Sequence, residues 1–284
     1  MMSKQIICID PGHGGYDPGA VASGAREKDI TLQIGLQLRD LLQRAGLQVV
    51  MTRERDQSPG GYTKVNADLR ERCRIANDAG VDTFLSIHVN AGGGTGAEIY
   101  VSGDGGRIAG LANGIIRNVS SICGTHGQAV RDGGPSGAGW AVIRNTVADA
   151  MLVEIGFIDS DDLSKIQAHL HEFAPLIARA FCDFYGVPFP EQSQPVLDKD
   201  GANLVISQLG ALTKTVTPDV LVACNYAANA LRRGISAPIN EDHGAPSSQA
   251  AATLLDLLGS LWKSTARREV QDAYHFAADA LRGV

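Results

Sequence analysis

The stretch ICIDPGHGGYDPGA, residues 7–20, is where a predicted strand runs into a glycine-rich loop that carries a single histidine. The apolar run at 5–9 is typical of a short buried strand, and Asp-Pro-Gly ends it because proline has no N–H for a strand ladder. Glycines on both sides of His13 allow a ligand or another backbone to approach closely. Because the carboxyl ends of strands form the active-site crevice of an α/β sheet, this stretch predicts both the fold and the place of its site.

Strand-like and helix-like segments alternate from this stretch to about residue 187. Apolar residues at helical spacing predict helices over 28–46, 66–80 and 107–123, and apolar runs predict strands over 47–52, 82–90, 96–102 and 150–158. Asp159 to Asp162 are expected to cap a last helix that ends at Tyr185. The alternation predicts an α/β fold in which a twisted, mostly parallel sheet is flanked by helices.

A second, wholly helical domain follows a proline-rich connection. We expect the first domain to cover residues 1–187, a linker to cover residues 188–199, and a small all-α domain to cover residues 200–284. Thr217 and Pro218 are predicted to start a helix, and Gly234 is predicted to end it.

The helical domain contains an internal repeat. LGAL at 209–212 recurs as LGSL at 258–261, and ANALR at 228–232 recurs as ADALR at 278–282. The apolar positions recur too: Val205, Leu209, Leu212 as Leu254, Leu258, Leu261, and Val220, Cys224, Ala227, Leu231 as Val270, Tyr274, Ala277, Leu281. Each repeat should therefore be a helical hairpin, and the two hairpins should pack as a four-helix unit.

The composition excludes several kinds of partner. The formal net charge is -6 and aromatic residues make up 5% of the chain. A basic groove for a phosphate backbone is therefore not expected, and nucleic acid is not a predicted partner. No segment approaches the length of a membrane span, so no membrane insertion is predicted.

Two features bear on the cellular compartment. The N-terminal residues MMSKQIICID carry one lysine and an apolar run too short for the h-region of a signal peptide. The five cysteines are scattered and form no Cys-x-x-Cys pair, which predicts buried free thiols rather than disulfides or a cysteine-rich zinc site. We therefore expect the chain to be made and kept in the cytoplasm, and to act elsewhere only after release.

Residues at strand and helix ends predict a metal site. His13 follows the first strand, Glu27 begins the next helix, and His88 ends an apolar strand before the glycine run at 92–94. Two imidazoles and one carboxylate are the ligand set of an open zinc site, which leaves one position for water. Glu154 stands alone in the apolar strand MLVEIGFI, where an unpaired carboxylate is costly. Burial should raise its pKa toward the range useful for proton transfer.

Each of these residues also has an ordinary structural explanation. A histidine near a strand end is usually structural, and an acid in the first turn of a helix suits the helix dipole. The glycine-rich loop could suggest phosphate binding, but it lacks both Gly-x-Gly-x-x-Gly and the Lys-Ser/Thr of a P-loop. The other histidines are interpreted as solvated or core residues: His126, His169, His171, His243 and His275.

Five motifs resemble, in order and approximate spacing, those of the zinc-dependent N-acetylmuramoyl-L-alanine amidases of the Amidase_3 family: IDPGHGGYDPGA, REKDITL, LRERCRIAN, FLSIHVNA and VIRNTVADAMLVEIGFIDS. The resemblance covers about residues 5–185. It implies that zinc is bound by His13, Glu27 and His88, and that Glu154 is the catalytic glutamate. Asn90 is a candidate for substrate contact, with a strand-to-loop turn residue as the alternative. Arg53, Asp56, Arg72 and Asn77 also fit the family pattern, without an assigned role.

The resemblance implies hydrolysis of the amide bond between the lactyl group of N-acetylmuramic acid and L-alanine in peptidoglycan. A zinc-activated water would attack, and its proton would pass through Glu154. Mostly short loops and one helix are expected between His88 and Glu154, so no extra helix is predicted to block the site. With the absent export signal, this favours a phage or prophage endolysin that lyses its host. The alternatives are a sporulation or autolytic amidase of the same chemistry, another zinc hydrolase, and a non-catalytic peptidoglycan-binding protein.

The C-terminal helical domain carries no cluster of His, Glu or Asp typical of catalysis, and its charges nearly balance. It loosely resembles the helical tail pieces of some phage lysins, which implies cell-wall targeting. The alternative is a homo-oligomer that forms through this domain.

Overall fold

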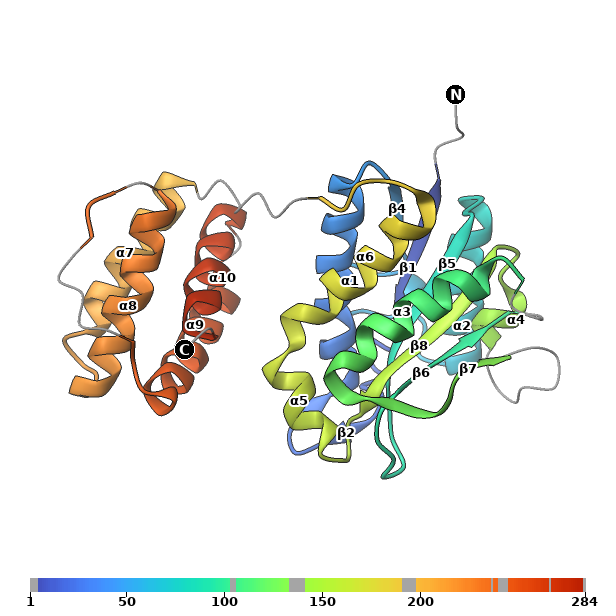
Figure 1. Cartoon of the computed structure of the whole chain (residues 1–284), viewed down its shortest axis with the longest axis horizontal. Coiled ribbons are helices and arrows are strands. Elements are labelled where there is room, and N and C mark those ends of the chain that lie inside the picture. The colour runs from blue at the N-terminus through green and yellow to red at the C-terminus, as the bar shows by residue number, and fades with distance from the viewer. Residues whose placement is uncertain are drawn as a thin grey trace. The chain divides into compact units, whose positions relative to one another are not determined.

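The computed structural model of the chain describes residues 5–102, 106–132, 141–190, 198–235, 237–239, 245–265 and 267–282. These residues belong to two compact units, Met1–Pro190 and Glu191–Val284. The first unit is built on a sheet, and the second is helical in its described part (Figure 1). The boundary between the units falls within the predicted linker, of which residues 191–197 lie outside the described residues.

The first unit contains a six-stranded sheet. In spatial order its strands are β4 (Gln48–Met51), β1 (Ile6–Pro11), β5 (Thr83–Asn90), β8 (Asp149–Phe157), β6 (Ala97–Val101) and β7 (Thr125–Asp132). Only the β6–β8 pair is antiparallel among these neighbours. The predicted mostly parallel α/β sheet is therefore confirmed.

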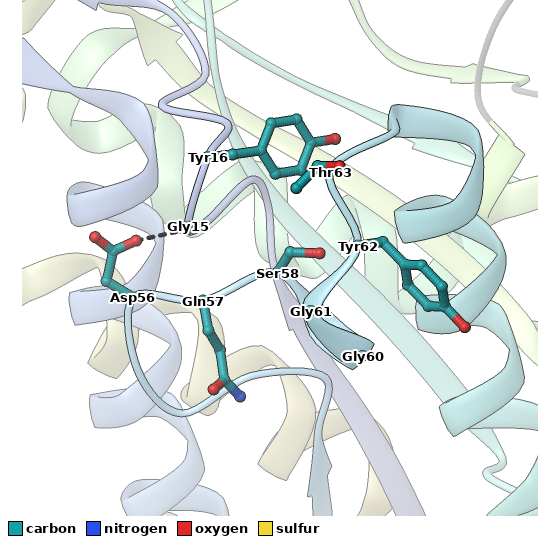
Figure 2. Close-up of a pocket in the computed structure, with 9 residues that line it drawn as sticks. All are labelled: Gly15, Tyr16, Asp56, Gln57, Ser58, Gly60, Gly61, Tyr62 and Thr63. Carbon is teal, nitrogen blue, oxygen red and sulfur yellow. Dashed lines mark hydrogen bonds between the residues drawn. The ribbon is translucent and has the colours of Figure 1, made fainter.

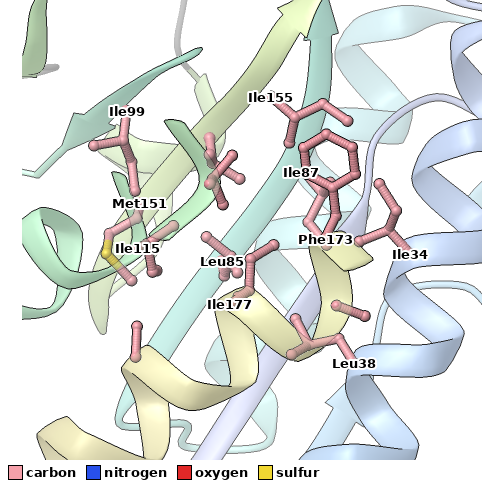
Figure 3. Packing of buried hydrophobic residues seen from close by; sticks show 14 of the residues in the cluster. Ile34, Leu38, Leu85, Ile87, Ile99, Ile115, Met151, Ile155, Phe173 and Ile177 are labelled. Carbon is pink, nitrogen blue, oxygen red and sulfur yellow. The ribbon is translucent and has the colours of Figure 1, made fainter. Parts of the chain in front are cut away.

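Helices cover both faces of this sheet. On one face lie α1 (Glu27–Arg44), α3 (Ile108–Cys123) and α6 (Leu170–Tyr185), and on the other lie α2 (Val65–Asp78) and α4 (Ala141–Asn145). Figure 3 shows Leu85 of β5 and Phe173 of α6 in the larger apolar cluster. Phe84 belongs to the smaller cluster on the α2 face. Because successive strand residues point to opposite faces, His88, four residues after Phe84, projects on the α2 face near the end of β5.

The structure corrects the predicted helix after β8. That helix is two helices, α5 (Asp162–Ala168) and α6, separated at His169. Within the segment predicted to cap it, Asp161 at the N-cap makes no side-chain capping hydrogen bond, whereas the hydroxyl of Ser160 accepts a hydrogen bond from the N–H of Asp162, the first residue of α5. Asp159 instead accepts hydrogen bonds from the N–H groups of Gly92 and Gly93, and Asp162 accepts from Gly96 and Phe157. These two carboxylates therefore bind backbone N–H groups of the loop at 92–96 and of Phe157 at the end of β8.

Several short elements were not predicted. They are the hairpin of β2 (Val21–Ala22) and β3 (Ala25–Arg26), the turn η1 (Pro59–Gly61), strand β7 and helix α4. One helix was expected between His88 and Glu154, but the described residues of this stretch form two, α3 and the short helix α4. Helix α4 packs against α2 and β8. Residues 103–105 and 133–140 of this stretch lie outside the described residues.

The second unit consists, in its described residues, of α7 (Lys199–Leu212), α8 (Pro218–Gly234), α9 (Ser248–Ser264) and α10 (Arg268–Arg282). Equivalent positions of the two repeats meet in one buried cluster, as Leu209 and Leu258 do. As predicted, Pro218 occupies the first turn of α8 and the helix ends at Gly234, whereas the N-cap Thr217 makes no side-chain capping hydrogen bond. The helical C-terminal region is thus confirmed.

Two predictions from composition can be compared with the structure. All five cysteines are free and buried, as predicted. Among the described helices, none has both the length and the apolar content that a bilayer crossing requires.

Candidate metal centre

His13 is held in an unusual backbone conformation at the carboxyl end of β1. Its φ is 62°, a left-handed value that non-glycine residues rarely adopt. The loop is packed so closely that a Cβ on Gly14 would lie 2.4 Å from the carbonyl oxygen of Gln57. Such strain persists only where the surroundings impose it, and it is often found at functional sites.

Two buried arginines impose this loop conformation. Arg72 donates to the carbonyl oxygen of His13 at 2.7 Å, and Arg53 donates to that of Gly12 at 2.9 Å. Arg72 is also ion-paired with Asp10 at 2.7 Å and with Asp68 at 2.6 Å. Although burial by itself would raise the pKa of Asp10, Arg72 and two hydroxyl donors lower it, so the carboxylate stays charged. The arginines that fit the family pattern therefore shape the His13 loop.

Glu27 is the first residue of α1 and lies between the two histidines. Its Oε2 lies 3.1 Å from Nε2 of His13, and its Oε1 lies 2.9 Å from Nδ1 of His88. The backbone N–H groups of Ala20 and Val89 donate to the same two oxygens, each at 2.9 Å. The carboxylate is therefore fixed in place by partners from two segments of the chain, the loop at 13–20 and strand β5.

His88 completes the group. Its ring stands edge-on to that of His13, with 4.9 Å between the ring centroids, and packs so closely on Gly12 that a Cβ there would lie 2.4 Å from Cε1. One donor atom from each of His13, Glu27 and His88 lies within 4.8 Å of the other two. The structure thus brings together the three residues that the sequence analysis singled out, and this donor set fits an open zinc site.

Asp17 orients the first histidine and was not predicted. Its Oδ2 lies 2.8 Å from Nδ1 of His13, so Nε2 is the nitrogen that faces Glu27. A carboxylate on the far nitrogen of a metal-binding histidine fixes the ring and raises its basicity. Asp17 follows His13 by four residues in the same turn-rich loop, but aspartate is common in turns, so the sequence did not single it out.

The charges of this group are strongly coupled. Although burial by itself would lower the pKa of His13, its contacts with Glu27 and Asp17 raise that pKa to about 9. Burial would also raise the pKa of Glu27, but the hydrogen bonds from His13 and His88 hold it well below its ordinary value. A cation is thus electrostatically favoured between the histidines and the carboxylate, and a metal ion would replace the histidine proton there.

Glu154 lies on β8, the strand next to β5, at the position opposite His88. In the register of the sheet it is paired with His88 of β5 and with Glu98 of β6. Burial raises its pKa to about 7, in the direction predicted, and the nearby carboxylates of Glu27 and Glu98 add to the rise. Its Oε2 is buried and has no hydrogen-bond partner among the described residues. An unsatisfied acceptor beside the donor set is suited to binding a water at the metal.

Asn90 ends β5 and fits the structural alternative. Its Nδ2 donates to Glu98 at 2.8 Å, and its Oδ1 accepts from the N–H of Ala91 at 2.8 Å. Both polar ends of the side chain are therefore engaged within the protein. Glu98, which sequence analysis missed, is buried and ion-paired with Arg131 at 2.8 Å. Its isolation in the apolar strand GAEIYVS was the same signal that identified Glu154.

The remaining predicted positions lie outside this group. Asn77 bridges to the backbone of Asn145 and Val147, and Asp56 accepts hydrogen bonds from Gly15 N–H and the Lys28 ammonium. The other histidines with described side chains sit elsewhere: His126 packs against Phe157, and His169 and His171 lie near Glu172. His243 and the side chain of His275 are outside the described residues.

Known proteins resemble this chain in sequence and in structure. The N-acetylmuramoyl-L-alanine amidase family model, Amidase_3, matches residues 7–180. The sporulation-specific N-acetylmuramoyl-L-alanine amidase of Bacillus subtilis (strain 168) is 36% identical over 233 residues, 80% of this chain and 81% of the relative. The endolysin of Bacillus phage SPP1 is 36% identical over 185 residues, 61% of this chain and 63% of the relative. Among solved structures, the amidase AmiC2 of Nostoc punctiforme is 28% identical with a TM-score of 0.54, covering 65% of this chain and 98% of its own.

Proposed function

The chain belongs to the N-acetylmuramoyl-L-alanine amidase family and is a peptidoglycan amidase, and from this premise we propose that it is a zinc enzyme. His13, Glu27 and His88 would hold the ion, and the reaction would cleave the amide between the lactyl group of N-acetylmuramic acid and L-alanine. The observation that carries the proposal is the convergence of these three donors within 4.8 Å, next to the unsatisfied oxygen of Glu154.

Zinc bound to two histidines and one carboxylate lowers the pKa of a coordinated water toward about 7 and polarises a substrate carbonyl. The protein supplies the remaining requirements. Asp17 and Glu27 fix the nitrogen of His13 that faces the site, and the edge-on contact of His88 with His13 fixes the second ring. Preorganised donors of this kind need no rearrangement during the reaction.

Glu154 would move the proton. As a carboxylate it would accept a proton from the attacking water while the water oxygen bonds to the lactyl carbonyl carbon. As the carbon–nitrogen bond breaks, the same side chain would return that proton to the departing nitrogen of L-alanine. A pKa raised to about 7 by burial suits a group that must both accept and release a proton near neutral pH. The products are a lactyl acid on the glycan and a stem peptide with a free amino end.

The test combines zinc analysis with end-group analysis. Purified protein should contain about one zinc per chain, and His88→Ala should lose it. Digested peptidoglycan should gain alanine amino ends, measured by amino-end labelling. New amino groups on other residues, or free glucosamine, would indicate a different zinc hydrolase and would refute the proposal. If the purified protein contains no metal and binds cell walls without cleaving them, the chain is a wall-binding module and the proposal is refuted.

The biological setting that we propose is lysis of a host cell wall after release from the cytoplasm. Similarity to a phage endolysin supports it, and similarity to a sporulation-specific amidase supports the alternative of mother-cell lysis with the same chemistry. Fractionation of producing cells tests the setting. Retention in the cytoplasm, followed by lysis only when the membrane is permeabilised, is the expected result. Export from intact cells would refute it.

For the C-terminal helical unit we propose cell-wall targeting. A separate compact unit joined to the enzyme would raise the local substrate concentration, even with weak affinity for the wall. Formation of a homo-oligomer is the alternative. Wall pelleting and solution mass distinguish the two roles.

A further inference from the structure

Lys28 follows the proposed metal ligand Glu27 directly, in the first turn of α1, and it is buried. The residue is 6% exposed, whereas lysine is almost never buried unless its charge is paired. A cation in the residue after a metal ligand also works against the binding of a metal ion, because like charges repel. What the ammonium binds must therefore offset both costs.

The ammonium of Lys28 and the carboxylate of Asp56 together hold the backbone of Gly15. Nζ of Lys28 donates to the carbonyl oxygen of Gly15 at 2.9 Å and to Oδ2 of Asp56 at 2.8 Å. Oδ1 of Asp56 accepts from the N–H of Gly15 at 2.8 Å, the hydrogen bond drawn in Figure 2 at the edge of a hollow between the two loops. These three hydrogen bonds form a closed ring that joins α1, the loop after β1 and the loop after β4.

Gly15 lies at the centre of the loop that presents the first histidine. It is two residues after His13 and two residues before Asp17, whose carboxylate orients the His13 ring. The N–H of Gly14 donates to the carbonyl oxygen of Asp17 at 2.9 Å, and the N–H of Asp17 donates back to that of Gly14 at 3.2 Å. Because the loop is closed on itself in this way, a shift of Gly15 moves both His13 and Asp17.

The loop needs an anchor at this point because its backbone is strained. His13, Gly14 and Gly15 all have positive φ values, of 62°, 127° and 61°. For a non-glycine residue such a conformation persists only where the surroundings impose it. The two buried arginines hold the carbonyl groups of residues 12 and 13, and the lysine–carboxylate pair holds the backbone beyond them. Released at Gly15, the loop would relax and draw Nε2 of His13 away from Glu27.

The main chain of Lys28 binds the same two segments. Its N–H donates to the carbonyl oxygen of Pro18 at 3.1 Å, in the loop after β1. Its carbonyl oxygen accepts from Nη2 of Arg53 at 2.8 Å, in the segment after β4. Lys28 thus connects the helix that begins at Glu27 to both loops, through its backbone and through its side chain.

Relying on the proposed function, we propose that Lys28 is a positioning residue of the zinc site. It holds the loop of His13 against the helix of Glu27, so that the two donors keep the separation that the metal requires. The charge of the lysine acts in the opposite direction, since loss of a cation would strengthen the attraction for zinc. Positioning and charge therefore predict opposite changes in zinc affinity when the ammonium is removed.

The first test is Lys28→Met, which removes the ammonium and keeps an apolar stem of similar length. The fold should survive, because the side chain of Asp56 is 48% exposed and water can replace the lysine there. Urea unfolding checks that the variant is folded. Chelator competition should show that its zinc affinity is reduced about 10- to 100-fold, the range for residues that orient a metal ligand.

The matched control is Arg26→Met, which removes a cation from the other side of Glu27. The Arg26 side chain is 51% exposed and is ion-paired with Asp29 at 2.7 Å, within the start of the same helix. It holds neither loop through that contact. The control variant should therefore bind zinc as tightly as wild type or slightly more tightly.

A second readout needs neither zinc nor hydrolysis. In the zinc-free protein, the ring-nitrogen NMR signals of His13 should move in Lys28→Met and should stay in place in Arg26→Met. Asp56→Ala should also reduce zinc affinity. The double variant of Lys28 and Asp56 should lose less than the product of the two single losses, because both residues act on the backbone of Gly15.

Three results would each overturn the role of Lys28: zinc affinity in Lys28→Met equal to or above that of wild type, unmoved His13 signals, or single losses that multiply in the double variant. A wild-type protein that binds no zinc, or that releases no alanine amino ends, would refute the proposed function instead. The His13 signals of the zinc-free protein would then still decide whether the lysine holds the loop.

Discussion

Glu154→Gln is expected to remove most of the activity while zinc and fold are retained. The substitution keeps the shape of a side chain that is 5% exposed, and Oε2 can become an amide nitrogen without breaking a hydrogen bond among the described residues. A positioned general base usually contributes about 10²- to 10⁴-fold to the rate, which corresponds to roughly 3–5 kcal/mol of transition-state stabilisation. We expect kcat to fall by that factor.

The pH dependence provides a second signature of Glu154. A general base works only when it is unprotonated, so activity should rise with pH as the side chain ionises and should level off above its pKa. Burial raises this pKa to about 7, and a bound cation would lower it, so the acid limb should lie at or below about 7 in the zinc enzyme. The acid limb should be absent from the residual activity of Glu154→Gln.

The assay is the release of alanine amino ends from peptidoglycan over a range of pH, with zinc content measured on the same samples. Glu98→Gln is the matched control, since it removes another buried carboxylate from the adjacent strand. Because Glu98 raises the pKa of Glu154, this control should shift the acid limb to lower pH with a much smaller loss of rate. A Glu154→Gln enzyme that keeps its zinc and works within about tenfold of wild type would refute the reasoning.

Two further substitutions test the packing around the metal centre, and a deletion tests the role of the C-terminal unit. Gly12→Ala places a Cβ 2.4 Å from the His88 ring, so a chelator competition should show zinc affinity reduced on the order of 10- to 100-fold, and unchanged affinity would contradict the packing argument. Arg72→Met leaves Asp10 buried without its ion pair and should cost about 3–5 kcal/mol in urea unfolding, whereas a loss below about 1 kcal/mol would argue against the arginine as the anchor of the loop. Deleting 191–284 should abolish pelleting with cell walls and preserve hydrolysis of soluble muropeptides; a fall in solution mass beyond that of the deleted segment would identify an oligomerisation unit instead.

Local periodicity was sufficient for most of the first unit. The strand predicted at 82–90 is β5 (Thr83–Asn90), because a buried strand must be apolar along most of its length. Strand β7 (Thr125–Asp132) was missed, since THGQAVRD combines polar residues with a glycine. An edge strand pairs with one neighbour and buries less side-chain area, so it can form without an apolar pattern.

The candidate site could be predicted where a single residue departs from its surroundings. Glu154 was identifiable because a carboxylate in an apolar strand needs a partner or a function. The orienting role of Asp17 and the anchoring role of Arg72 were not, because aspartate in a turn and arginine in a helix are common. Their roles depend on contacts, and the one between Arg72 and His13 spans 59 positions in the chain.

The sequence by itself determined the alternation of the main strands and helices of the first unit, the kinds of side chain available for a metal site, and the one carboxylate whose burial in β8 had to be compensated. These follow from short-range periodicity and from the cost of burying charge. Only the tertiary structure decided that Glu27 lies between His13 and His88, and that the loop after β4 closes against Gly15 to form a hollow beside them. Such contacts join segments tens of residues apart, and packing rather than any local pattern selects which segments meet.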